Sequence, residues 1–203
     1  MHVELGPFLV ISILLILIPG PDTAVVTKNA LLGGRRGGFL TAVGVSVGLA
    51  IWTAAAALGI AAVLRASAIA FLALKIAGAV YLVWMGIQML RTKDFSTATT
   101  GAPASGGRAF RQGLLSDLGN PKIAVFFTSF LPQFVDPDTS AFASLLLLGG
   151  IFAVLTLLWL AAYGWLVGHG ASVLRRPSVR RVLDRVTGVI LIGFGIRLAL
   201  ERR

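Results

Sequence analysis

The chain has 203 residues, of which 57% are hydrophobic and 13% are charged, and it contains no cysteine. Soluble domains carry about 25% charged residues, and a chain of this length cannot bury so much apolar surface in one soluble core. The composition therefore excludes a soluble domain and indicates an integral membrane protein, and the lack of cysteine excludes disulfides and thiolate chemistry. The net charge of +10 does not indicate nucleic-acid binding, because basic residues that flank a lipid bilayer explain it.

Apolar runs long enough to cross a membrane, for which about 20 residues suffice, recur along the chain. They fall near residues 5–27, 39–64, 68–90, 110–131, 141–168 and 186–201. We therefore predict an all-α membrane protein with six transmembrane helices. Lys and Arg concentrate in the loops after the first, third and fifth of these helices. Because cytoplasmic loops are the ones enriched in Lys and Arg, both termini are predicted to lie on the non-cytoplasmic side.

A small, polar stretch without periodicity covers residues 92–108 and is typical of a flexible linker, here on the cytoplasmic side. It divides the single membrane domain, residues 1–203, into two three-helix halves, residues 1–91 and 109–203. Since three is odd, the second half enters the membrane from the opposite side. The sequence thus predicts two inverted-topology repeats.

The first and fourth predicted helices are both broken at proline. Gly20-Pro21-Asp22 and Asn120-Pro121-Lys122 interrupt apolar runs at an offset of 100 residues. Broken hydrophobic helices at corresponding places in two halves are the best sequence indication of a transporter's substrate site. At about 1.5 Å per residue, both breaks lie near the middle of a hydrocarbon core about 30 Å thick. We therefore expect them to share one cavity.

Both breaks have the residues of a helix start. Asn120 is a favourable N-cap and Pro121 suits the first helical position, while Gly20 and Pro21 offer a weaker version of the same start. Each break is expected to begin a short half-helix, and the second of these half-helices is expected to end before Pro132. Because a proline-broken backbone at membrane depth needs partners, it lies in protein or lines a cavity.

Two opposite charges occupy corresponding positions of the breaks, Asp22 in the first and Lys122 in the second. A carboxylate can meet an α-ammonium, and an ammonium beside a helix start can meet an α-carboxylate, so the hypothesis is an amino-acid site. The alternative is that Asp22 and Lys122 pair with each other to hold the halves together. The candidate substrate-binding residues are Gly20, Pro21, Asp22, Asn120, Pro121 and Lys122.

Two further charged residues lie inside predicted spans. Asp117 is three residues before Asn120 on the same helical face, and intramembrane carboxylates are functional by default. Asp117 is the first candidate for a proton carrier and Asp22 is the second; capping or pairing with Lys122 is the alternative role for Asp117. Lys75 has either an accessory functional role or a side chain that extends toward the membrane surface.

Glycines at helical spacing, Gly44 with Gly48 and Gly164 with Gly168, allow close helix contact. We expect them to pack inside the bundle, and the alternative is a homodimer through a glycine-rich face. No metal-ligand spacing, nucleophile–base constellation or phosphate-binding loop is present. No metal, cofactor or enzymatic activity is therefore expected.

At these residues the sequence resembles the LysE/RhtB family of amino-acid exporters. The matching motifs are Pro19-Gly20-Pro21-Asp22, residues 72–82, and Asn120-Pro121-Lys122 followed by residues 126–134, and the likeness runs nearly end to end. The resemblance implies a multi-pass protein of the bacterial cytoplasmic (inner) membrane. It also implies efflux of amino acids or derivatives such as homoserine, threonine, leucine or lysine, driven by the membrane potential or proton gradient rather than by ATP.

The predicted function is a secondary transporter that exports amino acids by alternating access with proton coupling. One alternative is a cation or metal exporter of the same architecture, which the lack of acidic, His and Cys clusters disfavours. A second alternative is a non-transporting membrane scaffold, whose helix breaks would serve packing alone.

Overall fold

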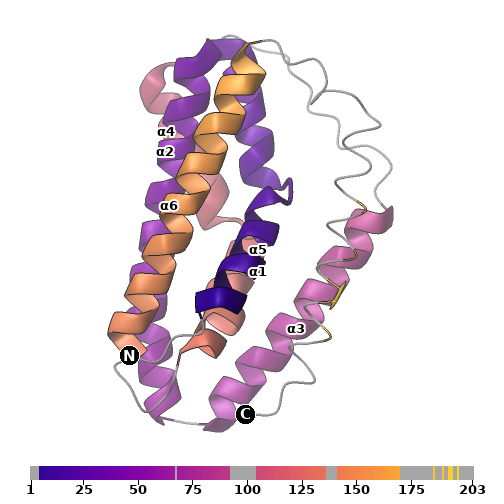
Figure 1. The fold of residues 1–203 in the computed structure, drawn as a ribbon, viewed down its shortest axis with the longest axis vertical. Coiled ribbons are helices and arrows are strands. Elements are labelled where there is room, and N and C mark those ends of the chain that lie inside the picture. Colours follow the sequence, from indigo (N-terminus) through magenta and orange to yellow (C-terminus); the bar gives the residue numbers. More distant parts are fainter. Residues whose placement is uncertain are drawn as a thin grey trace.

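The computed structural model describes residues 5–66, 68–91, 104–135 and 141–169, together with five single residues between 185 and 196. Every element in this described part is a helix, arranged as a bundle (Figure 1). The elements are α1 (Leu5–Leu17), α2 (Pro21–Ala66), α3 (Ala68–Arg91), α4 (Gly106–Leu118), α5 (Pro121–Val125), the π-helix η1 (Phe126–Phe130), the 3-10 helix η2 (Leu131–Phe134) and α6 (Ala141–Gly168).

The helices have the apolar character that the sequence predicts. Among the described residues, two stretches are long and apolar enough to cross a membrane, Pro21–Gly59 and Ala141–Gly168, and α1 is a shorter apolar helix. The structure therefore agrees with an all-α membrane protein. The predicted sixth span, residues 186–201, and most of the linker lie outside the described residues, so the six-helix inverted repeat stays a prediction.

A sharp turn divides α2 into a short first part and a long second part. Gly34 has φ 62° and ψ −160°, in the left-handed region that favours glycine. The side-chain amide Nδ2 of Asn29 donates to Thr41 Oγ1 at 2.9 Å, although twelve residues of straight helix would span about 18 Å. The two parts of α2 therefore fold back against each other. The turn at Gly34 connects the half-helix that begins at Pro21 to the second predicted span.

Three glycines let α2 and α4 pack closely, two of them with backbone against backbone. A Cβ atom on Gly44 would meet the carbonyl oxygen of Phe110, and one on Gly113 would meet the carbonyl oxygen of Thr41. A Cβ atom on Gly48 would lie 2.5 Å from a carboxyl oxygen of Asp117. These glycines pack inside the bundle, which is the first of the two roles that their spacing predicts.

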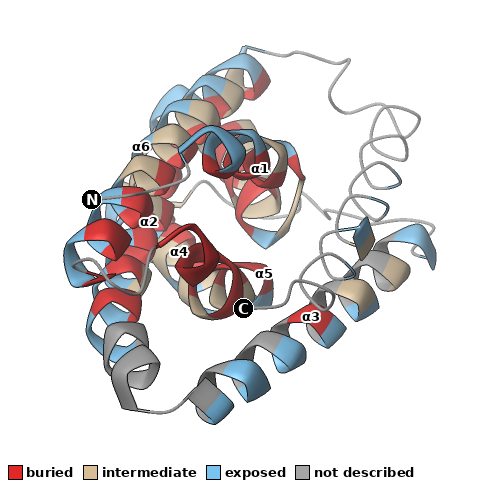
Figure 2. Cartoon of the chain, turned by 60° about the horizontal axis from the view of Figure 1, so that its bottom comes forward, coloured by how far each residue is buried: buried red, intermediate tan, exposed pale blue. Residues whose placement is uncertain are grey.

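The second glycine pair also packs inside the bundle. A Cβ atom on Gly164 would lie 3.4 Å from the Cα atom of Gly38, and one on Gly168 would lie 3.2 Å from the backbone nitrogen of Arg35. α6 thus packs along α2 on a face of small residues, while α2 also packs along α4. Figure 2 shows the buried residues turned toward the inside of this arrangement.

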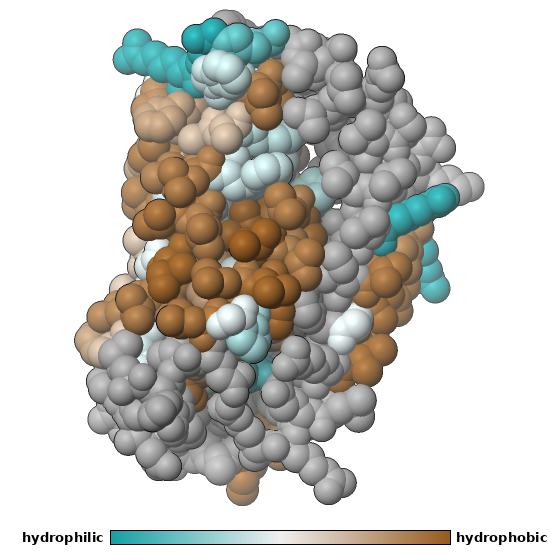
Figure 3. All heavy atoms as spheres, in the orientation of Figure 1, coloured by the Kyte–Doolittle hydropathy of each residue, from teal (hydrophilic) through white to brown (hydrophobic). Residues whose placement is uncertain are grey.

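Large apolar side chains cover much of the outer surface. Figure 3 shows them across the middle of the visible face, with a group of hydrophilic residues at its top end and a few more at its right side. A surface of this kind suits contact with lipid, in which no water is present to solvate polar groups. On α1, α3 and α6 the exposed members include Val10, Ile13, Ile69, Val80, Trp84, Val154, Leu158 and Trp165.

The second half-helix is longer than the sequence indicates. The expectation that it ends before Pro132 is wrong, because the winding continues from α5 through η1 into η2, which ends at Phe134. Pro132 lies at the start of the 3-10 helix, where the missing amide hydrogen breaks no intrahelical bond. The proline changes the type of helix without ending the helical path.

The close contact between α2 and α4 predicts a steric test. Gly44→Ala and Gly113→Ala should each lower the free energy of unfolding by about 1–3 kcal/mol, because the added methyl groups meet backbone atoms that cannot move aside. Gly59→Ala is the matched control, since a Cβ atom there meets nothing within 4 Å and alanine favours the helix. Thermal unfolding of the purified protein in detergent measures the difference. Equal melting temperatures for all three variants would contradict the packing.

Candidate substrate site

The two helix breaks meet inside the bundle. α1 ends at Leu17 and α2 begins at Pro21, so residues 18–20 form the first break. α4 ends at Leu118 and α5 begins at Pro121, which leaves the second break at residues 119–120. Side chains from the second break bond to atoms of the first break, across about 100 residues of sequence. The contact between the breaks is therefore direct.

Asn120 serves both breaks with one amide group. Its Oδ1 atom accepts a hydrogen bond from the backbone nitrogen of Lys122 at 3.1 Å, so it caps α5, and Pro121 takes the first helical position. Its Nδ2 atom donates to Oδ2 of Asp22 at 2.6 Å. The capping role that the sequence predicts for Asn120 is confirmed. The bond to Asp22 links the cap of the second half-helix to the start of the first.

Asp22 lies in the first turn of α2, directly after Pro21, and is 8% exposed. Gly20 precedes this turn, and its carbonyl oxygen accepts from the backbone nitrogen of Ala24 at 3.0 Å. One oxygen of the Asp22 carboxylate accepts from Asn120, and the other accepts from Ser116 Oγ at 2.7 Å. Both donors are neutral, so these bonds satisfy the carboxylate oxygens without balancing the negative charge.

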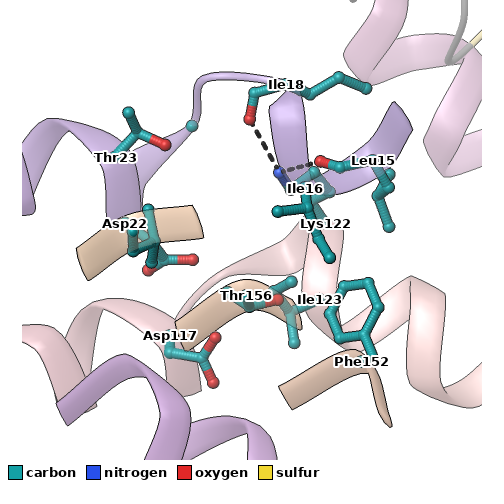
Figure 4. Close-up of a pocket in the computed structure, with 12 residues that line it drawn as sticks. Leu15, Ile16, Ile18, Asp22, Thr23, Asp117, Lys122, Ile123, Phe152 and Thr156 are labelled. Carbon is teal, nitrogen blue, oxygen red and sulfur yellow. Dashed lines mark hydrogen bonds between the residues drawn. The ribbon is translucent and has the colours of Figure 1, made fainter. Parts of the chain in front are cut away.

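Lys122 fills the vacant acceptors at the end of α1. Its ammonium group donates to the carbonyl oxygens of Leu15 at 3.2 Å and Ile18 at 3.3 Å (Figure 4). The last carbonyls of a helix have no intrahelical partner and carry partial negative charge, so a cation is the fitting partner. An ammonium has three donors, and these bonds use two. The third is available for another acceptor.

Asp22 and Lys122 do not bond to each other directly. The described residues include no ion pair between them, and each charge instead has hydrogen-bond partners contributed by the opposite half of the chain. The arrangement is reciprocal, since the first break supplies carbonyls to Lys122 and the second half supplies donors to Asp22. Asp22 and Lys122 both line one cavity, and they form no ion pair with each other.

Asp117 is fully buried beside the breaks, and neither of its carboxyl oxygens has a hydrogen-bond partner. The backbone of Gly48 packs against the carboxyl group, and Trp52 Nε1 donates to the backbone oxygen of Asp117 at 3.4 Å rather than to its side chain. Its carboxyl group makes neither the capping bond nor the bond to Lys122. A buried carboxylate without donors is costly, whereas the protonated carboxyl is neutral. Both oxygens of this carboxyl group therefore keep their hydrogen-bonding capacity unused inside the bundle.

A cavity of about 20 Å³ lies between the breaks and α6 (Figure 4). This volume accommodates about one water molecule, which is less than an amino acid needs. Residues of the first break and the first turn of α5 line it together with Asp22 and Asp117, and α6 forms a further wall through Phe152, Thr156 and Leu160. This wall was not predicted from the sequence. The spacing of four residues places Phe152, Thr156 and Leu160 on one face of a helix, but it does not indicate that this face meets the cavity.

Two predicted features stay untested by this geometry. Lys75 belongs to α3, but its side chain lies outside the described residues, so its accessory role stays a prediction. Within the described residues, no group of three or more His, Cys, Asp or Glu side chains could hold a metal ion.

Comparison with known proteins identifies the family of the chain. The family model described as LysE type translocator matches residues 13–202. The chain belongs to this family of membrane-embedded efflux transporters, which are not enzymes. No solved structure matches the chain.

The chain aligns with its relatives over nearly the whole length of both proteins. A threonine efflux protein of Salmonella typhi is 32% identical over 204 residues, which cover 95% of this chain and 95% of that protein. A homoserine/homoserine lactone efflux protein of the same organism is 31% identical, with coverage of 96% and 95%. The uncharacterized membrane protein YrhP of Bacillus subtilis (strain 168) is 30% identical, with coverage of 99% and 100%.

The double role of Asn120 predicts two separable effects. Asn120→Ala should lower the free energy of unfolding by about 1 kcal/mol relative to Asn120→Ser, because serine retains N-cap function and alanine does not. Both variants lose the long amide that donates to Asp22, so both should lose transport to a similar degree. Thermal unfolding in detergent and a transport assay on the same preparations measure the two effects. Normal transport by Asn120→Ser would show that the bond to Asp22 is dispensable.

Proposed function

We propose that this protein exports amino acids or amino-acid derivatives from the cytoplasm across the bacterial inner membrane, by alternating access coupled to protons. The observation that carries the proposal is the meeting of two broken helices at one cavity, with the Asp22 carboxylate and the Lys122 ammonium at its edge and not paired with each other. Membership of the translocator family supports it. So do the relatives named for threonine and homoserine efflux.

The charges assign the two ends of a zwitterion. The substrate α-ammonium binds Asp22, whose present partners are neutral donors. The α-carboxylate binds the remaining donor of Lys122, with Asn120 beside it. Gly20, Pro21 and Pro121 contribute by shape, because they set the backbone path that brings these groups to the cavity. An uncharged solute would bring no opposite charge to either residue, which favours a zwitterion.

Alternating access follows from the size of the cavity and the predicted repeats. A volume of about 20 Å³ holds about one water molecule, so an amino acid enters only when the walls separate toward one side of the membrane. Two inverted three-helix repeats would provide one such opening toward each side. Both termini lie on the non-cytoplasmic side in this arrangement, as the distribution of basic residues predicts.

Asp117 is the proposed proton carrier, with Asp22 as the second candidate. Its carboxyl group lines the cavity and has no hydrogen-bond partner, so its proton is not held by a fixed acceptor. One charge that crosses 100 mV releases about 2.3 kcal/mol, whereas a tenfold concentration gradient costs about 1.4 kcal/mol. One proton per amino acid is therefore sufficient to drive export against more than a tenfold gradient.

Dipeptide loading of cells tests the proposed function. Cells that express the wild-type protein should release at least one amino acid faster than cells without it, while Asp22→Asn and Lys122→Met should abolish the difference by removing one charge each. Lys28→Met is the control for a lysine loss away from the cavity. Western blots of the membrane fraction establish equal amounts of protein. If no amino acid is released faster with the wild-type protein, export is excluded and the scaffold alternative gains support.

The carrier role of Asp117 predicts a separation of exchange from accumulation. In proteoliposomes, Asp117→Asn should retain exchange of labelled for unlabelled amino acid, because Asp22 and Lys122 are intact. It should lose accumulation driven by an imposed pH gradient, because an amide cannot carry a proton. Accumulation at the wild-type level by Asp117→Asn would refute the role of Asp117, and the same measurement on an exchange-competent Asp22 variant would then test the second candidate.

A further inference from the structure

We infer that the hydroxyl group of Thr156 on α6 binds the side chain of the transported amino acid and sets the preference for polar side chains. This inference rests on the proposed function, because it names a specificity-determining residue for the same cavity. Thr156 is 7% exposed, lines the cavity, and its Oγ1 atom has no hydrogen-bond partner (Figure 4). It comes from a helix that contributes no residue to either break.

The other helical hydroxyls show what Thr156 does not do. A buried serine or threonine in a helix usually satisfies its hydroxyl by donating to the carbonyl oxygen four residues earlier. Several hydroxyls in the described part of the chain make that bond, at 2.6–3.0 Å. They belong to Thr27, Thr41, Ser46, Thr53 and Thr128. The Thr156 hydroxyl therefore keeps both its donor and its acceptor capacity.

Position separates Thr156 from the other unpartnered hydroxyls. Ser12 and Ser144 are also buried with no hydrogen-bond partner, but neither is among the residues that line this cavity. Thr156 lines the cavity, and so do Phe152 and Leu160, which lie one turn away on either side. α6 thus presents one unsatisfied polar group in an otherwise apolar wall. A ligand that enters the cavity is the partner available to it.

The remaining groups of the cavity determine which part of the ligand reaches α6. Asp22 and Lys122 bind the ammonium and carboxylate groups at the breaks, so the side chain of the amino acid points to the third wall. A hydroxyl or amide on that side chain bonds to Thr156, whereas an aliphatic side chain leaves the Thr156 hydroxyl unpaired when water is displaced. A site that hydrogen-bonds a substrate hydroxyl discriminates against the analogue that lacks it.

Threonine and valine test this preference, because they have nearly the same shape and differ in one hydroxyl group. The assay measures how well each competes for exchange of a labelled amino acid in proteoliposomes of wild-type protein and variants. The wild-type protein should prefer threonine. Thr156→Val should reduce the threonine-to-valine preference about tenfold, and Thr156→Ser should retain it. Thr53→Val is the matched control, since it removes an equally buried hydroxyl that is already bonded to Leu49.

Each outcome decides the question. If the wild-type protein exchanges no amino acid, the proposed function fails and this inference fails with it. If exchange occurs but the wild-type protein shows no preference for threonine, or Thr156→Val leaves the preference unchanged, the role of Thr156 is refuted while the exporter stands. Should Thr156→Val not fold, comparison of Thr156→Ala with Thr156→Ser isolates the hydroxyl instead, and equal preference in these two refutes the inference.

Discussion

The need to satisfy a broken backbone inside a membrane is the constraint on which this site depends. When α1 stops at Leu17, its last carbonyls lose their intrahelical partners, and lipid offers no replacement. Lys122 supplies donors to two carbonyls of this region, and Asn120 supplies the acceptor for the start of α5. The first break is thus completed by the Lys122 ammonium, which also lines the cavity. The contacts that satisfy the broken backbone therefore also place a charged group at the proposed binding site.

Close packing of glycine against a carboxyl group gives the site its second property. Gly48 has no side chain, so the backbone of α2 lies against the carboxyl group of Asp117 and excludes other donors. A larger residue would separate the helices and admit water or a new partner. The lack of a side chain at Gly48 and the lack of a hydrogen-bond partner at the Asp117 carboxyl group are therefore linked. The close contact with Gly48 accounts for the lack of a hydrogen-bond donor on the side of the Asp117 carboxyl group that faces α2.

Sequence analysis predicted the parts of this architecture that local signals specify. Proline and glycine mark the breaks, and asparagine before proline marks the cap at Asn120, because each acts within one helical turn. The partners of Lys122 were not predictable in this way, since Leu15 and Ile18 are more than 100 residues away. The hypothesis of an amino-acid site assigned the ammonium of Lys122 to substrate alone, although it also bonds to these carbonyls.

Other features depend on how helices pack, which a single sequence does not reveal. In the sequence, the turn at Gly34 is visible only as part of the Lys- and Arg-containing loop after the first predicted span. A single glycine does not reveal which neighbours will pack together after the chain reverses. The wall formed by α6 was missed for the same reason. Thr156 is an ordinary residue in an apolar helix until packing brings it to the cavity without a carbonyl partner.

The reciprocal bonding between the breaks also bears on how the proposed transport cycle is balanced. Hydrogen bonds to charged groups contribute about 1.5–3 kcal/mol each, and the bonds to Asp22 and Lys122 stabilise the closed arrangement in which the cavity is too small for an amino acid. A zwitterion offers an ammonium and a carboxylate to the same two residues, so it replaces bonds that opening breaks. A ligand shifts a conformational equilibrium only by its difference in affinity between the states. In the proposed cycle the closed cavity excludes the substrate, so binding would favour an open state, and the empty protein would return to the closed one through the bonds between its own two breaks.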